Sequence, residues 1–407
     1  MNNLQNILKK ELDLVVPGMV ADLISSKLAA KGITITKKEK QHLIKIISEK
    51  QEYNIIYQKW KLWENKNINI DITEEDIKSI EGKAEKFIQK MPELIESTLE
   101  NITDHMTTVL KKRWPKEKHE QQIIKNKFES DLVNIWKHPI DLLGMILTIA
   151  TELGSNINDE FRTDEDKSNT LAEVLTRLNA RGCQVGGEIL RLISSGYADG
   201  AMARWRTLHE ISVVASFIQE HGEETAKRYL QHSAVDSYYA ALNYEKHCER
   251  LGYLPFDISE LNKLKTDIND LKTLYGVEYA SEYGWAADVL KNPSPRFADI
   301  ERSIGVDHMR PYYKLASYNV HANPKGVLFK LGLLPETQLL LAGPSDFGLA
   351  DPGQNAAASL CLLSSTIILL RPTIDMILSV KVMERLAEEA AETFVDIQKQ
   401  MEGNGNE

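Results

Sequence analysis

Two arginines, a histidine and a glutamate cluster in the stretch GAMARWRTLHEISVVASFI. The pattern predicts a helix, and because an α-helix repeats about every 3.6 residues, Arg206 shares one face with Glu210 and with His209. Arg204 lies two residues upstream. Apolar runs on both sides place these charges at the edge of a core, where a buried charge needs a partner. The stretch is therefore interpreted either as an Arg206–Glu210 pair that bonds neighbouring helices or as a polar pocket in which Arg206 and His321 act on a ligand.

A second group of polar residues lies in YYKLASYNVHANPKG, where a predicted helix ends near Asn323–Pro324. His321 lies about two residues before that end, with Ser317 and Asn319 close to it in the sequence. A histidine in such a place is either a proton-transfer group that faces a cleft or a hydrogen-bonded core residue.

Two further candidate binding residues have a structural interpretation beside the functional one. His232, on the next predicted helix, is more typical of a histidine that bonds two helices. Trp285, in EYGWA, is more typical of core packing than of stacking on a ligand.

Sequence motifs that hold metals, phosphates or covalent intermediates are missing. The His209–Glu210 pair lacks the second histidine of a zinc helix, since position 213 is valine. A Gly-rich phosphate loop and a nucleophilic serine elbow are not found. The three cysteines, Cys183, Cys248 and Cys361, are far apart and have no metal-ligand spacing. We therefore expect neither a metal nor a cofactor.

Composition favours a cytoplasmic protein. The 407 residues are 43% hydrophobic and carry a formal net charge of −10, which argues against broad phosphate-driven binding of nucleic acid but leaves room for a local basic groove. The N-terminal segment has acidic residues and no long apolar core, unlike a signal peptide. The most apolar run, Ala356–Leu370, is shorter than the roughly 20 residues of a membrane span and predicts a buried core helix. We expect no membrane contact.

Hydrophobic periodicity predicts an all-α fold with a small β-hairpin. Residues 1–153 read as a multi-helix N-terminal region, 154–170 as a polar linker, 171–400 as a larger helical domain and 401–407 as a disordered tail. Thr73 and Asp76 predict a helix start. The segments Val327–Leu331 and Gln338–Ala342 predict the two strands of the hairpin.

The blocks EILRLISSGYADGAMARWRTLHE, YGWA and YKLASYNVHANPKG occur in this order. Together they resemble the bacterial family catalogued as domain of unknown function 5677, over roughly Leu171 to Arg385. The family name implies no reaction. The resemblance marks Glu188, Arg206, Glu210, Tyr283, Trp285, Ser317 and His321.

A second resemblance is to HEPN ribonucleases, helical proteins of toxin and phage-defence systems whose signature is an arginine, four to six residues and a histidine. Three segments match it, Arg204–His209, Arg302–His308 and Arg113–His119. The resemblance implies a dimer that brings two motifs together. It also implies that the arginine stabilises phosphate charge while the histidine moves a proton, so that the RNA 2′-hydroxyl attacks without a metal.

These observations lead to one functional expectation and two alternatives. The first is a defence or toxin-type effector that cleaves RNA without a metal, with Arg204, His209 and His321 as catalytic residues. The alternatives are a non-enzymatic helical scaffold that binds a small ligand or a partner protein, and a hydrolase that uses His321 with Glu210. The expected partners are RNA and, through the N-terminal region, a second copy or another protein. The candidate binding residues are Arg206, Glu210, His232, Tyr283, Trp285, Ser317 and Asn319.

Overall fold

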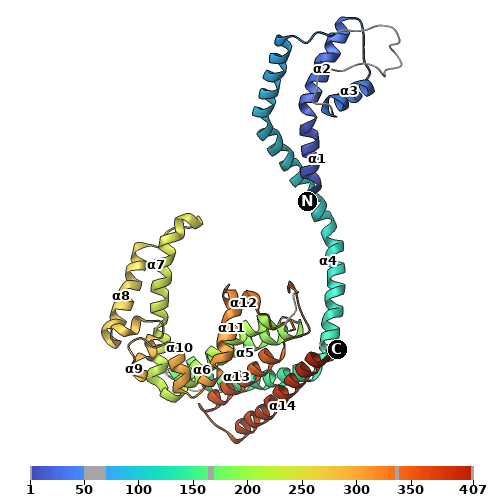
Figure 1. The fold of residues 1–407 in the computed structure, drawn as a ribbon. Helices are drawn as coiled ribbons and strands as arrows, with labels where there is room; N and C mark the ends of the chain where they lie inside the picture. The colour runs from blue at the N-terminus through green and yellow to red at the C-terminus, as the bar shows by residue number, and fades with distance from the viewer. Residues whose placement is uncertain (1, 50–69, 164–168, 335–338, 405–407) are drawn as a thin grey trace. The chain divides into compact units, whose positions relative to one another are not determined.

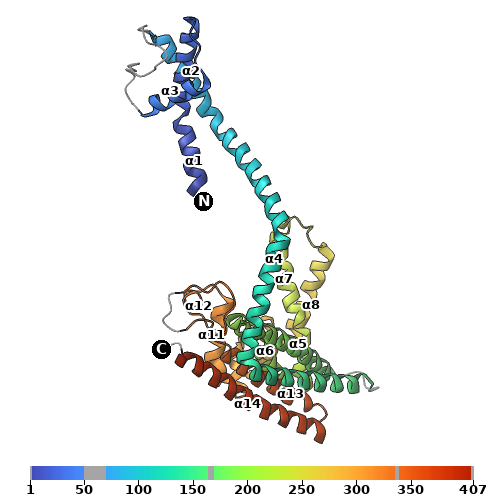
Figure 2. The same ribbon diagram turned by 90° about the vertical axis from the view of Figure 1, so that its right-hand side faces the viewer.

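The computed structural model describes residues 2–49, 70–163, 169–334 and 339–404 (Figures 1 and 2). The described residues form an all-α protein, as the periodicity predicted. The chain divides into two compact units, residues 1–120 and 121–407, and each is described by itself.

The first unit contains three short helices and the beginning of a very long one. These are α1 (Asn2–Asp13), α2 (Val15–Ala30), α3 (Lys37–Glu49) and the first part of α4 (Glu74–Thr163). The side chains of α2 and α3 form a small apolar cluster around Ile24, Leu28 and Leu43, which the α4 residue Ile80 covers in part. The predicted start of α4 is confirmed, because Thr73 Oγ1 accepts a hydrogen bond from the Asp76 amide at 3.3 Å and Asp76 Oδ2 accepts one from the Thr73 amide at 2.8 Å.

The second unit contains the rest of α4 and the other helices. Its long helices are α5 (Thr170–Ser194), α6 (Ala198–Gln231), α7 (Ser233–Leu251), α8 (Ile258–Tyr275), α11 (Arg310–Val320), α13 (Ala350–Ile368) and α14 (Ile374–Asn404). Its short helices are η1 (Val277–Ala280), η2 (Gly284–Ala286), α9 (Ala287–Leu290), α10 (Phe297–Ser303), η3 (Asp307–Met309) and α12 (Pro324–Leu328). Polar residues fix the helix starts: the Asn169 side chain accepts from Ala172 N at the start of α5, and Asp257 accepts from Ser259 N at the start of α8.

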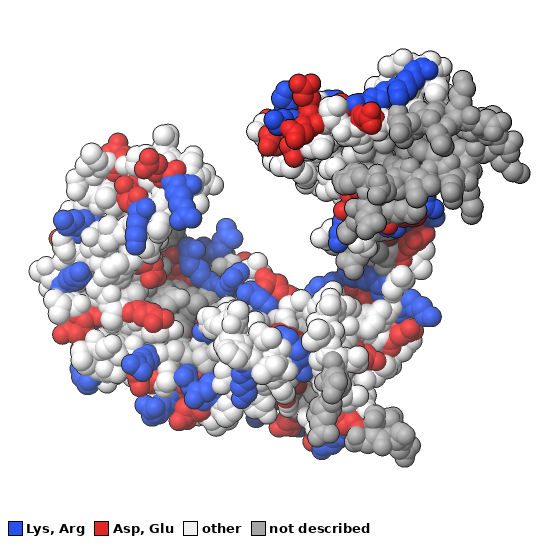
Figure 3. Space-filling model, turned by 45° about the horizontal axis from the view of Figure 1, so that its top comes forward, with Lys and Arg blue, Asp and Glu red and all other residues white. Residues whose placement is uncertain are grey.

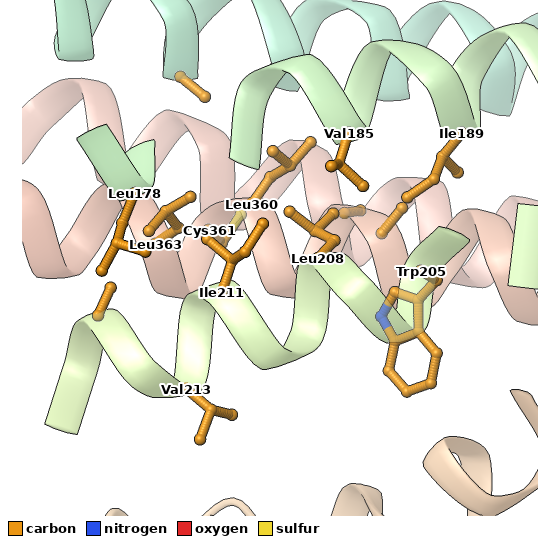
Figure 4. Packing of buried hydrophobic residues seen from close by; sticks show 14 of the residues in the cluster. Leu178, Val185, Ile189, Trp205, Leu208, Ile211, Val213, Leu360, Cys361 and Leu363 are labelled. Atoms are coloured by element: carbon orange, nitrogen blue, oxygen red, sulfur yellow. The ribbon is translucent and has the colours of Figure 1, made fainter. Parts of the chain in front are cut away.

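The core of the second unit lies where α5, α6 and α13 pack together (Figure 4). Leu178, Val185 and Ile189 project from α5 toward Leu208 of α6 and Leu360 of α13. The apolar run from Ala356 therefore lies in a buried core helix, as predicted, but this helix ends at Ile368, and Leu369 is exposed. Gly182 allows α5 to approach α13 closely, because a side-chain carbon at position 182 would overlap the side chain of Leu363 in α13.

The predicted β-hairpin is wrong. No strand occurs among the described residues, and the first predicted strand overlaps α12, which includes Val327 and Leu328. The reason is local: the Asn323 side chain caps this helix by accepting from Gly326 N at 2.8 Å, and Pro324 occupies the first helical turn, where its fixed φ is favourable. Of the second predicted strand, residues 339–342 are irregular and Gln338 lies outside the described residues.

The division of the chain also differs from the one expected. Helix α4 continues to Thr163, so the first ten residues of the segment expected to be a linker are helical, while 164–168 lie outside the described residues. The boundary between the compact units lies at Glu120–Gln121, inside α4. Likewise α14 continues to Asn404, and 405–407 lie outside the described residues.

Among the described helices, α4 alone is long and apolar enough to cross a membrane by length and composition. Of the apolar stretch of α4, 44% is buried inside the protein. Leu143 and Ile146 of α4 belong to the core of the second unit. The expectation of no membrane contact stays a prediction.

Candidate functional site

Three polar side chains meet where α6 packs on α11. The Tyr313 hydroxyl of α11 donates a short hydrogen bond to Glu210 Oε1 and accepts one from Arg206 Nη2 at 2.9 Å. Arg206 Nη2 also lies 3.2 Å from Glu210 Oε1. Arg206 and Glu210 are four residues apart on α6, so the helix itself brings them together on the face toward α11. The three groups form a closed polar triangle.

A second, more deeply buried group adjoins this triangle. His209 Nε2 lies 2.9 Å from Glu301 Oε1 of α10, and Arg310 Nη1 lies 2.5 Å from the other oxygen of the same carboxylate. Glu301 is 0% exposed and His209 is 2% exposed. A carboxylate buried this completely requires both partners, because an unpaired charge in the core is costly.

Tyr313 connects the two groups. The guanidinium carbon of Arg206 lies 4.8 Å from the centre of its ring, and that of Arg310 lies 5.1 Å from it. The faces of aromatic rings attract cations, so the ring is a favourable neighbour for both arginines. The triangle and the buried group therefore form one network, which consists of Arg206, His209, Glu210, Glu301, Arg310 and Tyr313.

Tyr313, and Tyr283 outside the network, are phenols that their surroundings keep neutral. Burial, and next the hydrogen bond to the Glu210 carboxylate, raise the pKa of Tyr313 to about 12, although Arg206 acts in the opposite direction. Burial and the nearby Glu210 charge also raise the pKa of Tyr283. The pKa of Arg206 is raised as well: burial, the largest influence, lowers it, but the bond to Tyr313 and the charge of Glu210 together outweigh burial. At neutral pH the two phenols are thus suited to donate hydrogen bonds, not to accept protons as bases.

The structure does not bring Arg204 and His209 together. Arg204 Nη2 lies 2.5 Å from Glu188 Oε2 of α5, whereas His209 faces Glu301 of α10. Five residues on a helix correspond to about 140° of rotation, so the two side chains leave α6 in different directions. In addition, Nε of Arg204 is buried and has no hydrogen-bond partner among the described residues.

His321 and its neighbours lie at the C-terminal end of α11. His321 is the C-cap residue, its side chain is exposed, and its amide donates to the Ser317 carbonyl at 3.2 Å. Ser317 Oγ in turn donates to the Tyr313 carbonyl, a contact within the helix. Asn319 Nδ2 is buried without a hydrogen-bond partner among the described residues. His321 is therefore near the network in sequence but is not one of its hydrogen-bonded members.

His232 and Trp285 lie in the core of the second unit. His232 is 4% exposed at the junction of α6 and α7, and its Nε2 donates to the Ser281 carbonyl at 2.9 Å. Trp285 is 4% exposed and packs edge-on against Phe217 and Tyr229, with ring centres 5.6 and 5.1 Å away. Both residues therefore hold neighbouring elements together.

Three members of the network, Glu301, Arg310 and Tyr313, were not expected from the sequence. The sequence FADIERSI does contain a pattern that indicates a buried position for Glu301, because Phe297, Ile300 and Ile304 recur at helical spacing. Glu301 lies on the same apolar face, and an acid in such a position must find a partner inside the protein.

Potential metal-ligand side chains and free thiols both occur in the described part of the chain. It contains no group of three or more His, Cys, Asp or Glu side chains that could hold a metal ion. Cys183, Cys248 and Cys361 are free thiols, and burial raises the pKa of Cys183 and Cys361, which makes these two poor nucleophiles at neutral pH.

The helices α5 to α12, which include all members of the network, have a counterpart among known families. Residues 172–334 match a family of unknown function (DUF5677). The match ends before α13 and α14, so it is shorter than the resemblance to Arg385 suggested. No curated protein and no solved structure matches the chain. The description of this family names no reaction, and the resemblance to HEPN ribonucleases stays a prediction.

Proposed function

We propose that the DUF5677 domain of this chain is a non-enzymatic helical module that binds a partner protein at the edge formed by α6 and α11. The observation that supports this proposal most is that the charged groups of the network are paired with one another, although Nε of Arg206 is buried without a hydrogen-bond partner among the described residues. The carboxylates of Glu210 and Glu301 each have an arginine partner, and His209 is held by Glu301. A catalytic histidine needs room for a substrate, which a 2% exposed imidazole bonded to a buried carboxylate does not have.

The outer edge of the network is suited to contact a partner. The side chains of Arg206, Glu210 and Arg310 are 26, 32 and 31% exposed, so each reaches solvent while its charged end stays anchored. Lys314 is exposed one turn after Arg310 on α11. Pre-anchored arginines lose little side-chain freedom on binding, which favours them at interfaces. Because Glu301 is fully buried, the exposed edge carries more positive than negative side chains and favours an acidic segment of a partner.

The surface charge supports a protein partner better than a nucleic acid. Over the face shown in Figure 3, Lys and Arg are interspersed with Asp and Glu across most of the second unit. Binding to a nucleic-acid backbone needs a continuous basic surface, and the chain as a whole carries a formal charge of −10.

The proposal is tested by a charge reversal on the exposed edge. We expect Lys314→Glu to lose proteins that the wild-type chain captures, by chemical cross-linking, from a bacterial lysate. Lys263→Glu is the matched control, because Lys263 is exposed on α8, outside the edge. A set of captured proteins that is the same for both variants and the wild type would contradict a contact surface at α6–α11.

RNA cleavage remains a second candidate because of one observation. Within residues 172–334, Arg302–His308 is the match to the arginine–histidine signature in which both side chains are exposed. Arg302 forms an ion pair with the partly buried Asp299 of α10, with Nη1 3.2 Å from Oδ1, while its own side chain is 67% exposed. Arg302 and His308 can therefore reach a phosphate and a ribose hydroxyl of RNA. Arg204 and His209, in contrast, are paired with Glu188 and Glu301.

A cleavage assay separates the two candidates. On our proposal, purified full-length chain leaves single-stranded and structured RNA intact with and without a chelator. If the wild type cleaves RNA in the chelator and His308→Ala lowers the rate by about 10²–10⁴-fold, the magnitude typical of lost proton transfer, the module is an enzyme and our proposal is wrong. The control is His247→Ala, which removes an exposed histidine of α7 outside the signature.

A further inference from the structure

Helix α4 carries an apolar stripe within the first unit. Ile88, Met91, Ile95, Leu99, Ile102, Met106 and Leu110 follow one another at intervals of three or four residues and so lie on one face. Leu99, Met106 and Leu110 are 48, 57 and 58% exposed. A groove of about 1080 Å³ runs along the upstream half of the stripe, lined by Ile88, Met91, Ile95 and Leu99 among others. An apolar face of this length is typical of a helix that packs against a partner.

The charges along the stripe are divided into two blocks of opposite sign. The segment Glu93–Asp104 contains four acidic and no basic side chains, whereas Lys111–Lys118 contains five basic and one acidic. Glu93, Glu100, Lys111 and Lys118 are all exposed, and none of these four forms an ion pair with another residue in the described part of the chain. The blocks are therefore available to an external partner.

The positions of these charges fit a second copy of the helix that runs in the opposite direction. Glu100 and Lys111 are 11 residues apart, about three helical turns, so both lie on the same flank of the stripe. Glu93 and Lys118 are 25 residues apart, about seven turns, and share that flank as well. Both pairs are centred between residues 105 and 106, next to Met106.

We propose that α4 mediates an antiparallel homodimer through this stripe, with the twofold axis close to Met106. In this arrangement Glu100 of each copy meets Lys111 of the other, and Glu93 meets Lys118. An antiparallel pair places equivalent flanks of the two helices side by side, so one flank receives four ion pairs. A parallel pair would place the acidic block of one copy against the acidic block of the other, which repels.

The apolar part of the interface is tested with full-length chain by analytical ultracentrifugation. We expect the wild type to be a dimer and Met106→Glu to be a monomer with unchanged helix content by circular dichroism. Leu94→Glu is the matched control: Leu94 is 51% exposed on the same helix, but it lies about a third of a turn away from Met106 around the axis and should leave the dimer intact. A monomeric wild type at micromolar concentration, or a Met106→Glu variant that still dimerises, would refute the proposal.

The orientation is tested by exchanging charges. Glu100→Lys places two lysines opposite each other and should weaken dimerisation about tenfold or more, as should Lys111→Glu. The double variant restores opposite charges in both pairs and should recover the wild-type dissociation constant. Single variants without effect would exclude the antiparallel alignment. A double variant that fails to recover, while it keeps its helix content, would show that Glu100 and Lys111 do not face each other in the dimer and would refute the proposed alignment.

Discussion

Replacing Glu301 by alanine is expected to lower the free energy of unfolding by about 3–5 kcal/mol, the cost typical of removing one partner from a buried ion pair. The carboxylate is 0% exposed and holds two groups, Nε2 of His209 and Nη1 of Arg310. Without it, the His209 ring stays enclosed by Trp205 and Phe297 with an unsatisfied nitrogen. Arg310, which is partly exposed, retains some solvation, so most of the cost falls on the histidine side.

The measurement is urea unfolding of the full-length chain, followed by circular dichroism and tryptophan fluorescence, because two compact units need not unfold in one step. Glu173→Ala is the matched control. Its carboxylate pairs with Arg177 one turn away at 2.8 Å, but both side chains are largely exposed, and such a pair contributes only about 0.3–0.5 kcal/mol. Equal effects of the two substitutions would show that the Glu301 group is not a stabilising element.

Local sequence patterns account for the part of the fold that was predicted correctly. Helices were predicted correctly where an apolar face repeats over several turns, as in α6 and α13, or where a polar cap precedes it, as at Thr73. The hairpin failed because VLFKL is too short to show either period. Its outcome was decided instead by the Asn323 cap and Pro324, which initiate α12.

The site shows a similar division between local and long-range information. The shared face of Arg206 and Glu210 follows from their spacing, and the structure has the two charges 3.2 Å apart. By contrast, Tyr313 and Glu301 reach this face from positions 107 and 92 residues away, and the periodicity of one helix contains no information on such contacts. Helical rotation alone does indicate that Arg204 and His209 diverge, since five residues never return to the same face.

The buried pairing with Glu301 also separates the structural from the functional role of His209. Because its imidazole is bonded to Glu301 inside the core, His209→Ala should reduce stability, and any loss of function in that variant follows from the fold. The charged side chains of Lys314 and of the α4 blocks are exposed and do not stabilise the core in this way. Partner binding and dimerisation are therefore best probed at these positions, where a change of function is separable from a change of stability.

The second large effect on stability is expected at Trp205, whose side chain connects α6 to α13 next to His209 of the network. Its side chain is 0% exposed, and its Nε1 donates to the Asn355 carbonyl at 2.9 Å and to Ser359 Oγ at 3.0 Å. Its ring also lies 5.1 Å from that of His209, centre to centre. Trp205→Ala should lower the free energy of unfolding by about 3–5 kcal/mol, because the core of α5, α6 and α13 loses the contacts of the ring and keeps a cavity.

Trp205→Phe separates the two contributions of this side chain. Phenylalanine keeps most of the ring volume but has no donor, so the Asn355 carbonyl is left without its partner from α6 at a cost of about 1–3 kcal/mol. Urea unfolding should therefore rank the stabilities as wild type, Trp205→Phe and Trp205→Ala. If the two variants lose the same stability, the hydrogen bonds to α13 and not the packing of the ring hold α6 in place. If Trp205→Ala loses less than 1 kcal/mol, α6 and α13 do not depend on this contact, and the position of the network would have to be fixed by α10 and α11 alone.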